Sequence, residues 1–431
     1  MNAMQYIRPK EPLAEIEFAL HRVLTHVFLI CDFLFASRIY RVIGASFMQP
    51  LLLGCAALII AFYVVYAMTR GRFVMPIACL CYIALVMNQL SVFADKLWIP
   101  VNVNAFFQYI WMLSFVPFVG LCLSGGRAYL LRCVAFYGTI YCSIYAVASA
   151  MQIVGILPGK LLEALVSSHD SRGARIFMYF GLGCFSYFYW LVQIRTKATH
   201  IAIAGFAICA LASILSLSRV YLLLTTVMTL LFLFQPRPAM IRLMSICILI
   251  CGATFVLSGM VFHTFNPFNL FAADTSGAYR ALEYTVVRQR LWMDPIWGFG
   301  LSSDIDLTKP FLGSYLIFSA DLGPLGIWFD FGIIGLVMYF VALVLCCRPP
   351  KAIPYEYGWP LFLTGCIMTA YGCMSPVAIS PGGAMMTGLI LATGLTGNGL
   401  ARRKSSESAP GEISHARSRV PALSAKFDFP R

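Results

Sequence analysis

Charged residues are scarce in this sequence. Asp, Glu, Lys and Arg together make up 11% of its 431 residues, whereas a soluble domain has about 25%. Hydrophobic residues make up 60%, which is more apolar surface than one globular core of this size can bury. The composition excludes a soluble enzyme, a secreted disulfide scaffold and a disordered chain. It predicts a polytopic membrane protein, because apolar runs of about 20 residues recur along the chain.

Cysteine motifs and histidine clusters are also missing. The 15 cysteines lie inside or at the edges of apolar runs, from Cys31 to Cys373, and no CxxC…CxxC pattern occurs. His169 and His263 are isolated, and the sequence has no HxxxH pattern. We therefore expect neither a disulfide framework nor a metal site, and the sequence implies no cofactor.

The remaining charge is mainly positive, with 31 Lys and Arg against 18 Asp and Glu. These basic residues occur in ones and twos between apolar runs, whereas a nucleic-acid-binding protein gathers them on one face or tail. We expect no nucleic-acid partner.

About twelve transmembrane helices are predicted, which makes the fold class an all-α polytopic membrane protein. If the N-terminus is cytoplasmic, the inside segments carry 20 of the 31 Lys and Arg residues, so the positive-inside rule favours both termini inside. The spans lie near 23–37, 49–68, 73–93, 104–123, 133–156, 176–194, 201–217, 220–234, 243–262, 323–347, 359–378 and 382–399.

The predicted organisation has five parts. A cytoplasmic N-terminal segment (1–22) precedes nine transmembrane helices (23–262). A large outer loop (263–322) follows, then three more transmembrane helices (323–399) and a disordered cytoplasmic tail (400–431) that contacts membrane lipids. Loops longer than about 15 residues are usually functional, so we expect the function to lie in the outer loop.

An amphipathic helix is predicted in this loop, between Ser276 and Asp294. At 100° per residue, four side chains share one stripe of that helix: Arg280, Tyr284, Val287 and Leu291. An arginine on an apolar stripe faces the protein, where it either binds an anionic ligand or pairs with a carboxylate such as Glu283 or Asp294. Arg288 and Arg290 flank the stripe as assisting cations or as ordinary solvated charges.

Further candidates lie on both sides of that helix. Gly298 and Gly300 form a tight turn that can bring backbone amides close to a phosphate, or is only a turn. Asp321 sits at the outer mouth of the tenth span, where a carboxylate also suits a helix N-terminus. Asp330 lies deeper in that span, where an acidic residue is costly and hence a functional candidate.

Three more arginines are predicted on the outer side. The apolar stretch 201–234 would be about 51 Å long as one helix, so it must turn at its polar SLSR sequence, which places Arg219 at the outer surface. Arg172 and Arg175 form a second basic rim or anchor the chain at the interface. Guanidinium groups bind phosphate oxygens bidentately. These residues therefore predict an outward-facing site for a lipid-linked phosphate or pyrophosphate, whose charge arginine rather than a metal would neutralise.

Three motifs in this order resemble the O-antigen polymerase and ligase superfamily: SGAYR, then MDPIWGFG, then DLGPLGIWFDFGIIGL. The SLSR sequence at 216–219 is similar to that family's Ser-Arg motif at the outer end of a middle span. O-antigen ligases carry a His-Asn pair where this chain has Asp321 and Leu322, which argues for a polymerase. In length, composition and the WMDPIWGFGLSSD region, the chain most resembles the xanthan-type exopolysaccharide polymerases.

This resemblance implies a membrane glycosyltransferase of the C type in the bacterial inner membrane. It implies transfer of a growing polysaccharide from undecaprenyl diphosphate to the next lipid-linked repeat unit, on the periplasmic face. Arg280 and Arg219 would then bind the donor pyrophosphate, with Arg288 or Arg290 assisting, and Asp321 would act as base or orient the acceptor. A chain-length regulator and a flippase of the same pathway are the implied partners.

Two alternatives stay open. A ligase would share the donor chemistry but transfer the glycan to another lipid acceptor. A transporter or flippase would need a central polar pathway, whereas the polar residues here concentrate in one outer loop.

Overall fold

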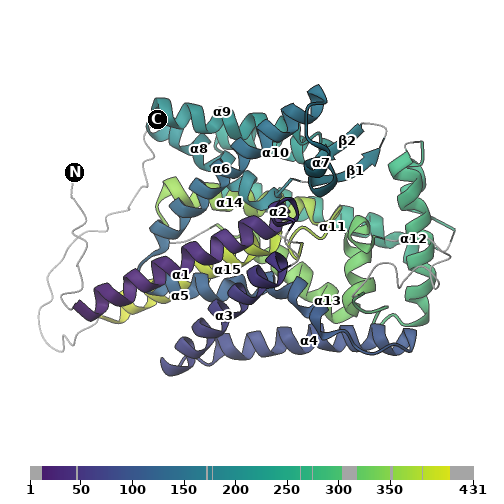
Figure 1. Ribbon diagram of the computed structural model, residues 1–431, viewed down its shortest axis with the longest axis horizontal. Coiled ribbons are helices and arrows are strands. Elements are labelled where there is room, and N and C mark those ends of the chain that lie inside the picture. The colour runs from purple at the N-terminus through teal and green to yellow at the C-terminus, as the bar shows by residue number, and fades with distance from the viewer. Residues whose placement is uncertain are drawn as a thin grey trace, which may run out of the picture.

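The computed structural model describes residues 12–44, 47–170, 173–176, 178–262, 264–273, 275–302, 318–349, 353–380 and 382–407. The described chain is almost entirely helical (Figure 1). Its first elements are α1 (Pro12–Ala36), α2 (Ile39–Ile43), α3 (Met48–Thr69), α4 (Val74–Leu97), the 3-10 helix η1 (Val103–Ser114), α5 (Phe115–Leu123), α6 (Arg127–Val154), α7 (Gly159–Leu165), β1 (Val166–Asp170) and β2 (Gly173–Ile176). The later elements are α8 (Phe180–Thr196), α9 (His200–Leu215), α10 (Arg219–Phe234), α11 (Pro238–Val261), η2 (Pro267–Phe271), α12 (Thr275–Met293), η4 (Ser319–Leu322), α13 (Pro324–Cys346), α14 (Tyr355–Tyr371) and α15 (Gly383–Glu407).

Every predicted span coincides with helical structure. In the described part, six helices are long and apolar enough to cross a membrane by length and composition: α1, α3, α4, α6, α11 and α13. Shorter apolar helices occur in the 109–123, 200–215, 219–234 and 383–394 segments. These features indicate a membrane protein, and the figure of twelve spans stays a prediction.

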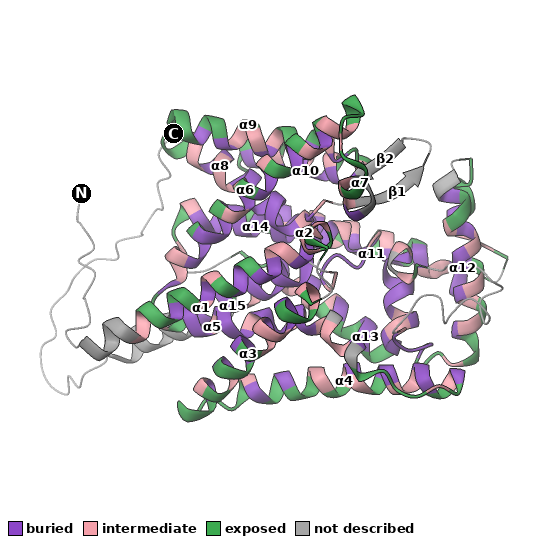
Figure 2. Cartoon of the chain, in the orientation of Figure 1, coloured by how far each residue is buried: buried purple, intermediate pink, exposed green. Residues whose placement is uncertain are grey.

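The centre of the molecule is a closely packed apolar core. Helix α8 lies in it and packs against α6, α9 and α14, and buried residues concentrate along α8 and α14 (Figure 2). Gly138 of α6 approaches α8 so closely that a Cβ there would meet Ser186 Oγ at 1.9 Å. On the outside, apolar side chains such as Leu58 and Leu80 are 73% and 65% exposed, as expected of a surface covered by lipid.

Two details differ from the predicted elements. Helix α1 begins at Pro12, well before the predicted start at residue 23. A short antiparallel hairpin, β1–β2, pairs His169 with Ala174 between the predicted spans 133–156 and 176–194. The hairpin adds a small β element to a chain that was expected to be all-α, and it lies outside the helical core.

The apolar stretch 201–234 turns where the sequence predicts. Helix α9 ends at Leu215, Leu217 takes the left-handed conformation with φ 52°, and α10 starts at Arg219. Two shorter helices replace the single helix that would be too long for one crossing.

Helix α12 stands at one end of the molecule. Both the start of α1 and the end of α15 lie at the opposite end (Figure 1). The loop that was predicted to carry function is therefore separated along the long axis from both ends of the described chain.

Candidate functional site

The inner face of α12 is anchored in a small apolar cluster. Tyr284, Val287 and Leu291 are fully buried, and they pack with side chains of α4, α11 and α13, including Phe93 and Phe329. The Tyr284 hydroxyl donates to the Val256 carbonyl of α11 at 2.8 Å. This confirms the apolar stripe that the sequence predicts, because residues three and four apart share one helix face.

Arg280 begins this stripe, one turn before Tyr284. Its side chain is partly buried, and within the described part of the chain its buried Nε atom has no hydrogen-bond partner. A guanidinium group that has left water needs acceptors. Arg280 is therefore placed to donate hydrogen bonds to an anionic ligand.

Glu283 is the buried carboxyl group beside Arg280. It is 1% exposed, and its Oε1 accepts a hydrogen bond from the Phe318 amide at 2.9 Å. Its Oε2 is buried with no hydrogen-bond partner among the described residues. Arg280 and Asp321 both lie within electrostatic reach of this carboxyl. The site thus combines a cation and two acidic groups where α12 packs against η4 and the start of α13.

The electrostatics of Glu283 follow from this position. Burial raises its pKa from 4.5 to about 7, the Phe318 amide lowers it, the Asp321 charge raises it and the Arg280 charge lowers it. The pKa rises overall because the carboxyl has lost most of its water and, among the described residues, accepts only the Phe318 hydrogen bond. Glu283 therefore changes charge near neutral pH.

This shift predicts a pH-dependent stability. Between pH 4.5 and about 7 the native protein holds the Glu283 proton and the unfolded chain does not, so the free energy of unfolding should decrease as pH rises through this range and level off above it. In Glu283→Gln the decrease should be smaller. Unfolding temperatures in detergent from pH 4.5 to 8 measure the difference, with Glu356→Gln on α14 as control. An unchanged pH dependence in Glu283→Gln would contradict the assignment.

Asp321 lies in η4, immediately before α13. Gly323 follows with a φ of 56°, and its Cβ would meet the Cys373 carbonyl oxygen at 2.6 Å, so the chain turns sharply there against the segment after α14. The predicted Asp321 and Arg280 are thereby brought to the same carboxyl, Glu283. Asp330, one of the sequence candidates, lies within α13 and accepts a hydrogen bond from Ser319 at 2.7 Å.

Arg288 joins α12 to the end of α11. Its Nη1 atom donates to the Gly259 carbonyl at 3.3 Å and to the Phe265 carbonyl at 3.2 Å. Its guanidinium carbon lies 6.0 Å from the centre of the Tyr284 ring. Arg288 therefore satisfies carbonyl groups where α11 ends, and Arg290 lies half-buried two residues further along α12.

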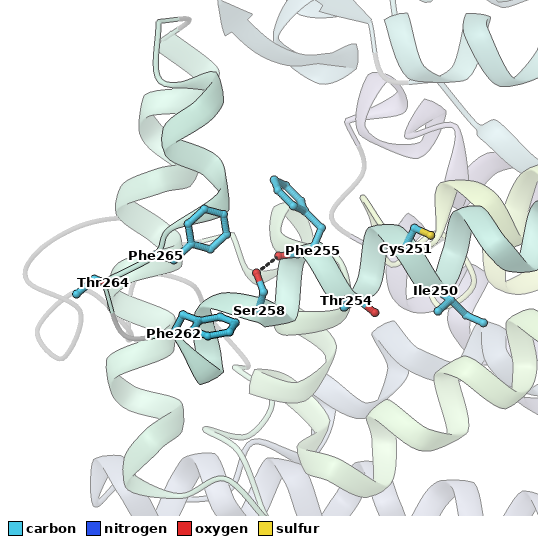
Figure 3. A pocket seen from close by; sticks show the side chains of 8 residues that line it. All are labelled: Ile250, Cys251, Thr254, Phe255, Ser258, Phe262, Thr264 and Phe265. Carbon is cyan, nitrogen blue, oxygen red and sulfur yellow. Dashed lines mark hydrogen bonds between the residues drawn. The ribbon is translucent and has the colours of Figure 1, made fainter.

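A groove runs along the outside of α11 towards α12. It has a volume of about 810 Å³ and is lined mainly by apolar atoms of Ile250, Cys251, Thr254, Phe255, Ser258, Phe262, Thr264 and Phe265. Phe262 and Phe265 lie beside α12, and Ile250 lies at the far end (Figure 3). The groove thus ends at Phe265, whose carbonyl accepts from Arg288.

The turn at Gly298 and Gly300 packs against α13 and α4. The amides of Phe299 and Gly300 both donate to the Phe329 carbonyl, at 2.6 and 3.3 Å, and the Leu301 amide donates to Gln89. The Phe329 carbonyl faces this turn because α13 is kinked at Gly332, with φ 67°. These bonds, with that of the Gly298 amide to Asp294, leave none of the four amides for a phosphate. They favour the plain-turn interpretation.

The packing role of this turn can be tested by adding a side chain at Gly298. Gly298 has a φ of +72°, and a Cβ there would lie 2.5 Å from the carbonyl oxygens of Phe329 and Trp328. Gly298→Ala should lower the free energy of unfolding by about 1–3 kcal/mol. Gly54→Ala in α3 is the control, because its Cβ would have no atom within 4 Å. Equal unfolding temperatures for the two variants would refute the packing role.

Lys96 is a residue of this region that the sequence analysis did not assign. Its Nζ lies 3.1 Å from Asp294 Oδ2 and donates to the Gly298 carbonyl. Asp294, one of the predicted partners of Arg280, is thus paired with Lys96 of α4. Only the fold brings these residues together, because 198 positions separate them in the sequence.

The other predicted arginines lie elsewhere. Arg219 is exposed at the first residue of α10, and α10 packs mainly on α14 and α9. Arg175 belongs to β2. Arg172 lies outside the described residues. In the described contacts, Arg280 and Asp321 form the site, and Arg219 is not joined to it.

The described residues contain no group of three or more His, Cys, Asp or Glu side chains that could hold a metal ion. The sequence does contain one D-x-D pair, Asp304 and Asp306, a spacing that can serve oxygen-binding cations. The pair lies outside the described residues. Metal independence therefore stays a prediction.

Comparison with protein families identifies a similarity over part of the chain. Residues 204–340 match the family model described as O-antigen ligase. The match covers about a third of the chain and includes Arg219, Arg280, Glu283 and Asp321. It supports the O-antigen polymerase and ligase superfamily for this region. Searches of curated proteins and of solved structures found no match.

Proposed function

We propose that this membrane protein is a polysaccharide polymerase. It transfers a growing glycan from undecaprenyl diphosphate to the next lipid-linked repeat unit on the periplasmic face of the bacterial inner membrane. The observation that carries this proposal is a pair of buried atoms, Arg280 Nε and Glu283 Oε2, that have no hydrogen-bond partner in the described part of the chain. They lie within electrostatic reach of Asp321 and inside the region that matches the O-antigen ligase family.

Arg280 binds the donor diphosphate in this proposal. Its planar guanidinium can hold two phosphate oxygens at once and neutralise the charge that develops as the glycosyl bond breaks. Glu283 acts as a positioning residue, because its carboxyl lies within electrostatic reach of Arg280. In this proposal, Arg219, Arg290 and the predicted basic rim of Arg172 and Arg175 add positive potential on the periplasmic side.

The groove along α11 accommodates the prenyl chain of the donor. Its apolar lining suits a hydrocarbon chain, and its end at Phe265 is linked by Arg288 to α12. The lipid tail would lie on α11 and the diphosphate at the Arg280 end of α12. Arg288 holds the two helices together, and this positions the groove relative to the charged site.

Asp321 serves the acceptor sugar. As a base, it takes the proton of the attacking hydroxyl while the new bond to the donor sugar carbon forms and the bond to the diphosphate breaks. The electron pair of the broken bond stays on undecaprenyl diphosphate. A positioned general base contributes about 10²–10⁴ in rate.

A ligase is the second candidate, because the matching family model is itself described as O-antigen ligase. The purified protein should be given a lipid-linked oligosaccharide alone and then together with a second lipid core. Multimers on the same prenyl lipid support the polymerase, and transfer to the second core supports the ligase. Movement of the lipid across vesicles with no new glycosidic bond would favour a transporter.

The proposed orientation places α12 outside the cell membrane and both chain ends in the cytoplasm, with the flippase and chain-length regulator of the pathway as partners. The separation of α12 from both described ends supports it (Figure 1). Reporter fusions in the 294–302 segment should be active only outside, and fusions after residue 407 only inside. Both reporters active on one side would contradict the orientation.

A further inference from the structure

We infer that a second cavity, at the opposite end of the molecule from α12, binds the headgroup of an anionic phospholipid. The cavity has a volume of about 590 Å³ and lies between α1 and the start of α6. These elements lie at the end of the molecule that holds both ends of the described chain (Figure 1). The site is separate from the proposed donor site and does not depend on the proposed function.

Two arginines give this cavity its charge. Arg22 of α1 and Arg132 of α6 both line it, and both lie within electrostatic reach of the Cys133 thiol. The Arg22 guanidinium carbon is held 4.4 Å from the centre of the Tyr129 ring, while the Tyr129 hydroxyl is hydrogen-bonded to His26 Nε2 at 2.5 Å. The arginine therefore rests on an aromatic ring that is itself fixed.

The described residues that line the cavity carry no negative charge. None of the nine lining residues, all of them in the described chain, is acidic. The nearby acidic residue of α1, Glu17, accepts from Arg70 at 2.6 Å and from Tyr66. A third arginine, Arg127, donates to Thr396 at 2.8 Å. Glu356 of α14 lies within electrostatic reach of Tyr189 and Tyr357, as Arg132 does. The ion pairs of the described residues nevertheless include neither Arg22 nor Arg132, so both cations can contact one anionic ligand.

The start of α6 adds donors to the same cavity. Gly126, which lines the cavity, is the N-cap residue of α6, and this helix start has no side-chain cap. The first amides of a helix need acceptors and carry the positive end of the helix dipole. Together with the guanidinium groups of Arg22 and Arg132, these amides can bind a phosphate group.

An apolar track identifies the ligand as a lipid. Phe136 forms one wall of the cavity, and it begins a row of exposed side chains on the same face of α6: Phe136 at 61%, Ile140 at 37% and Ile144 at 46%. The row extends about 12 Å along the helix, most of the way through one leaflet of a hydrocarbon core about 30 Å thick. A free phosphate would leave this track unused, whereas an acyl chain covers it.

Native mass spectrometry of the purified full-length protein tests the inference, with titration of phosphatidylglycerol and of phosphatidylcholine. We expect the wild type to prefer phosphatidylglycerol and Arg22→Ala/Arg132→Ala to bind it at least about tenfold more weakly. Arg72→Ala/Arg237→Ala removes the same charge at exposed positions outside the cavity and should change the affinity less than about twofold.

A second variant keeps the test independent of the arginines. Ala128→Trp fills the cavity and retains both cations, so it should also lose the preference for phosphatidylglycerol. Unchanged binding in either cavity variant would overturn the inference, and so would an equal loss in the control. Displacement of phosphatidylglycerol by millimolar inorganic phosphate would show a free-anion site and would overturn the lipid assignment.

Discussion

Replacing Arg280 by alanine should abolish polymer while the protein remains in the membrane at its normal level. Arg280 is the cation at the proposed diphosphate site, and the loss of one preorganised charge donor costs about 2.7–4 kcal/mol of activation free energy, or 10²–10³ in rate. The apolar anchor of α12, formed by Tyr284, Val287 and Leu291, is unchanged by the substitution. Polymer length and yield, measured beside immunoblots of the membrane fraction, give the result.

Arg280→Lys should fail as well, because a lysine ammonium cannot bind two oxygens in the planar geometry of a guanidinium. Arg237→Ala is the matched control, since Arg237 is exposed and lies between α10 and α11. Normal polymer in Arg280→Ala would show that the donor site has been placed on the wrong residue. Equal loss in the control would indicate a general effect of charge.

Asp321→Asn should lower the turnover rate by about 10²–10⁴ and leave binding of a prenyl diphosphate analogue unchanged. The amide keeps the shape of the side chain but cannot take a proton from the acceptor hydroxyl. Single-turnover assays with a saturating lipid-linked acceptor separate this effect from weaker binding.

The control for Asp321 is Asp95→Asn, a substitution of an exposed carboxylate near the end of α4. It should leave turnover unchanged. Full activity in Asp321→Asn would exclude the base role, and loss of analogue binding together with turnover would instead make Asp321 part of the donor site.

The stripe on α12 and its arginine could be predicted from the sequence because helix periodicity is a local property. Tyr284, Val287 and Leu291 recur at helical spacing, and the structure confirms their burial. The turn at SLSR was also predictable, because the length of the apolar run exceeds the thickness of a bilayer.

Glu283 and Lys96 required the fold. The sequence analysis considered Glu283 only as a partner for Arg280, whereas its burial depends on the Phe318 segment, which folds back over α12. Lys96 pairs with Asp294 only because α4 passes beside the turn that follows α12. The glycine turn was similarly ambiguous in the sequence, since a pair of glycines permits both a phosphate loop and a close packing contact.

The sequence by itself determined the class of protein, the helical segments and the separation of polar residues into one loop, because hydropathy and helical periodicity depend only on neighbouring residues. The tertiary structure decided which charges meet. It paired Lys96 with Asp294, brought Glu283 within electrostatic reach of Arg280 and Asp321, and brought Arg22 and Arg132 to one cavity. Interactions between charges depend on distance and burial in three dimensions, and neither can be read from positions along the chain.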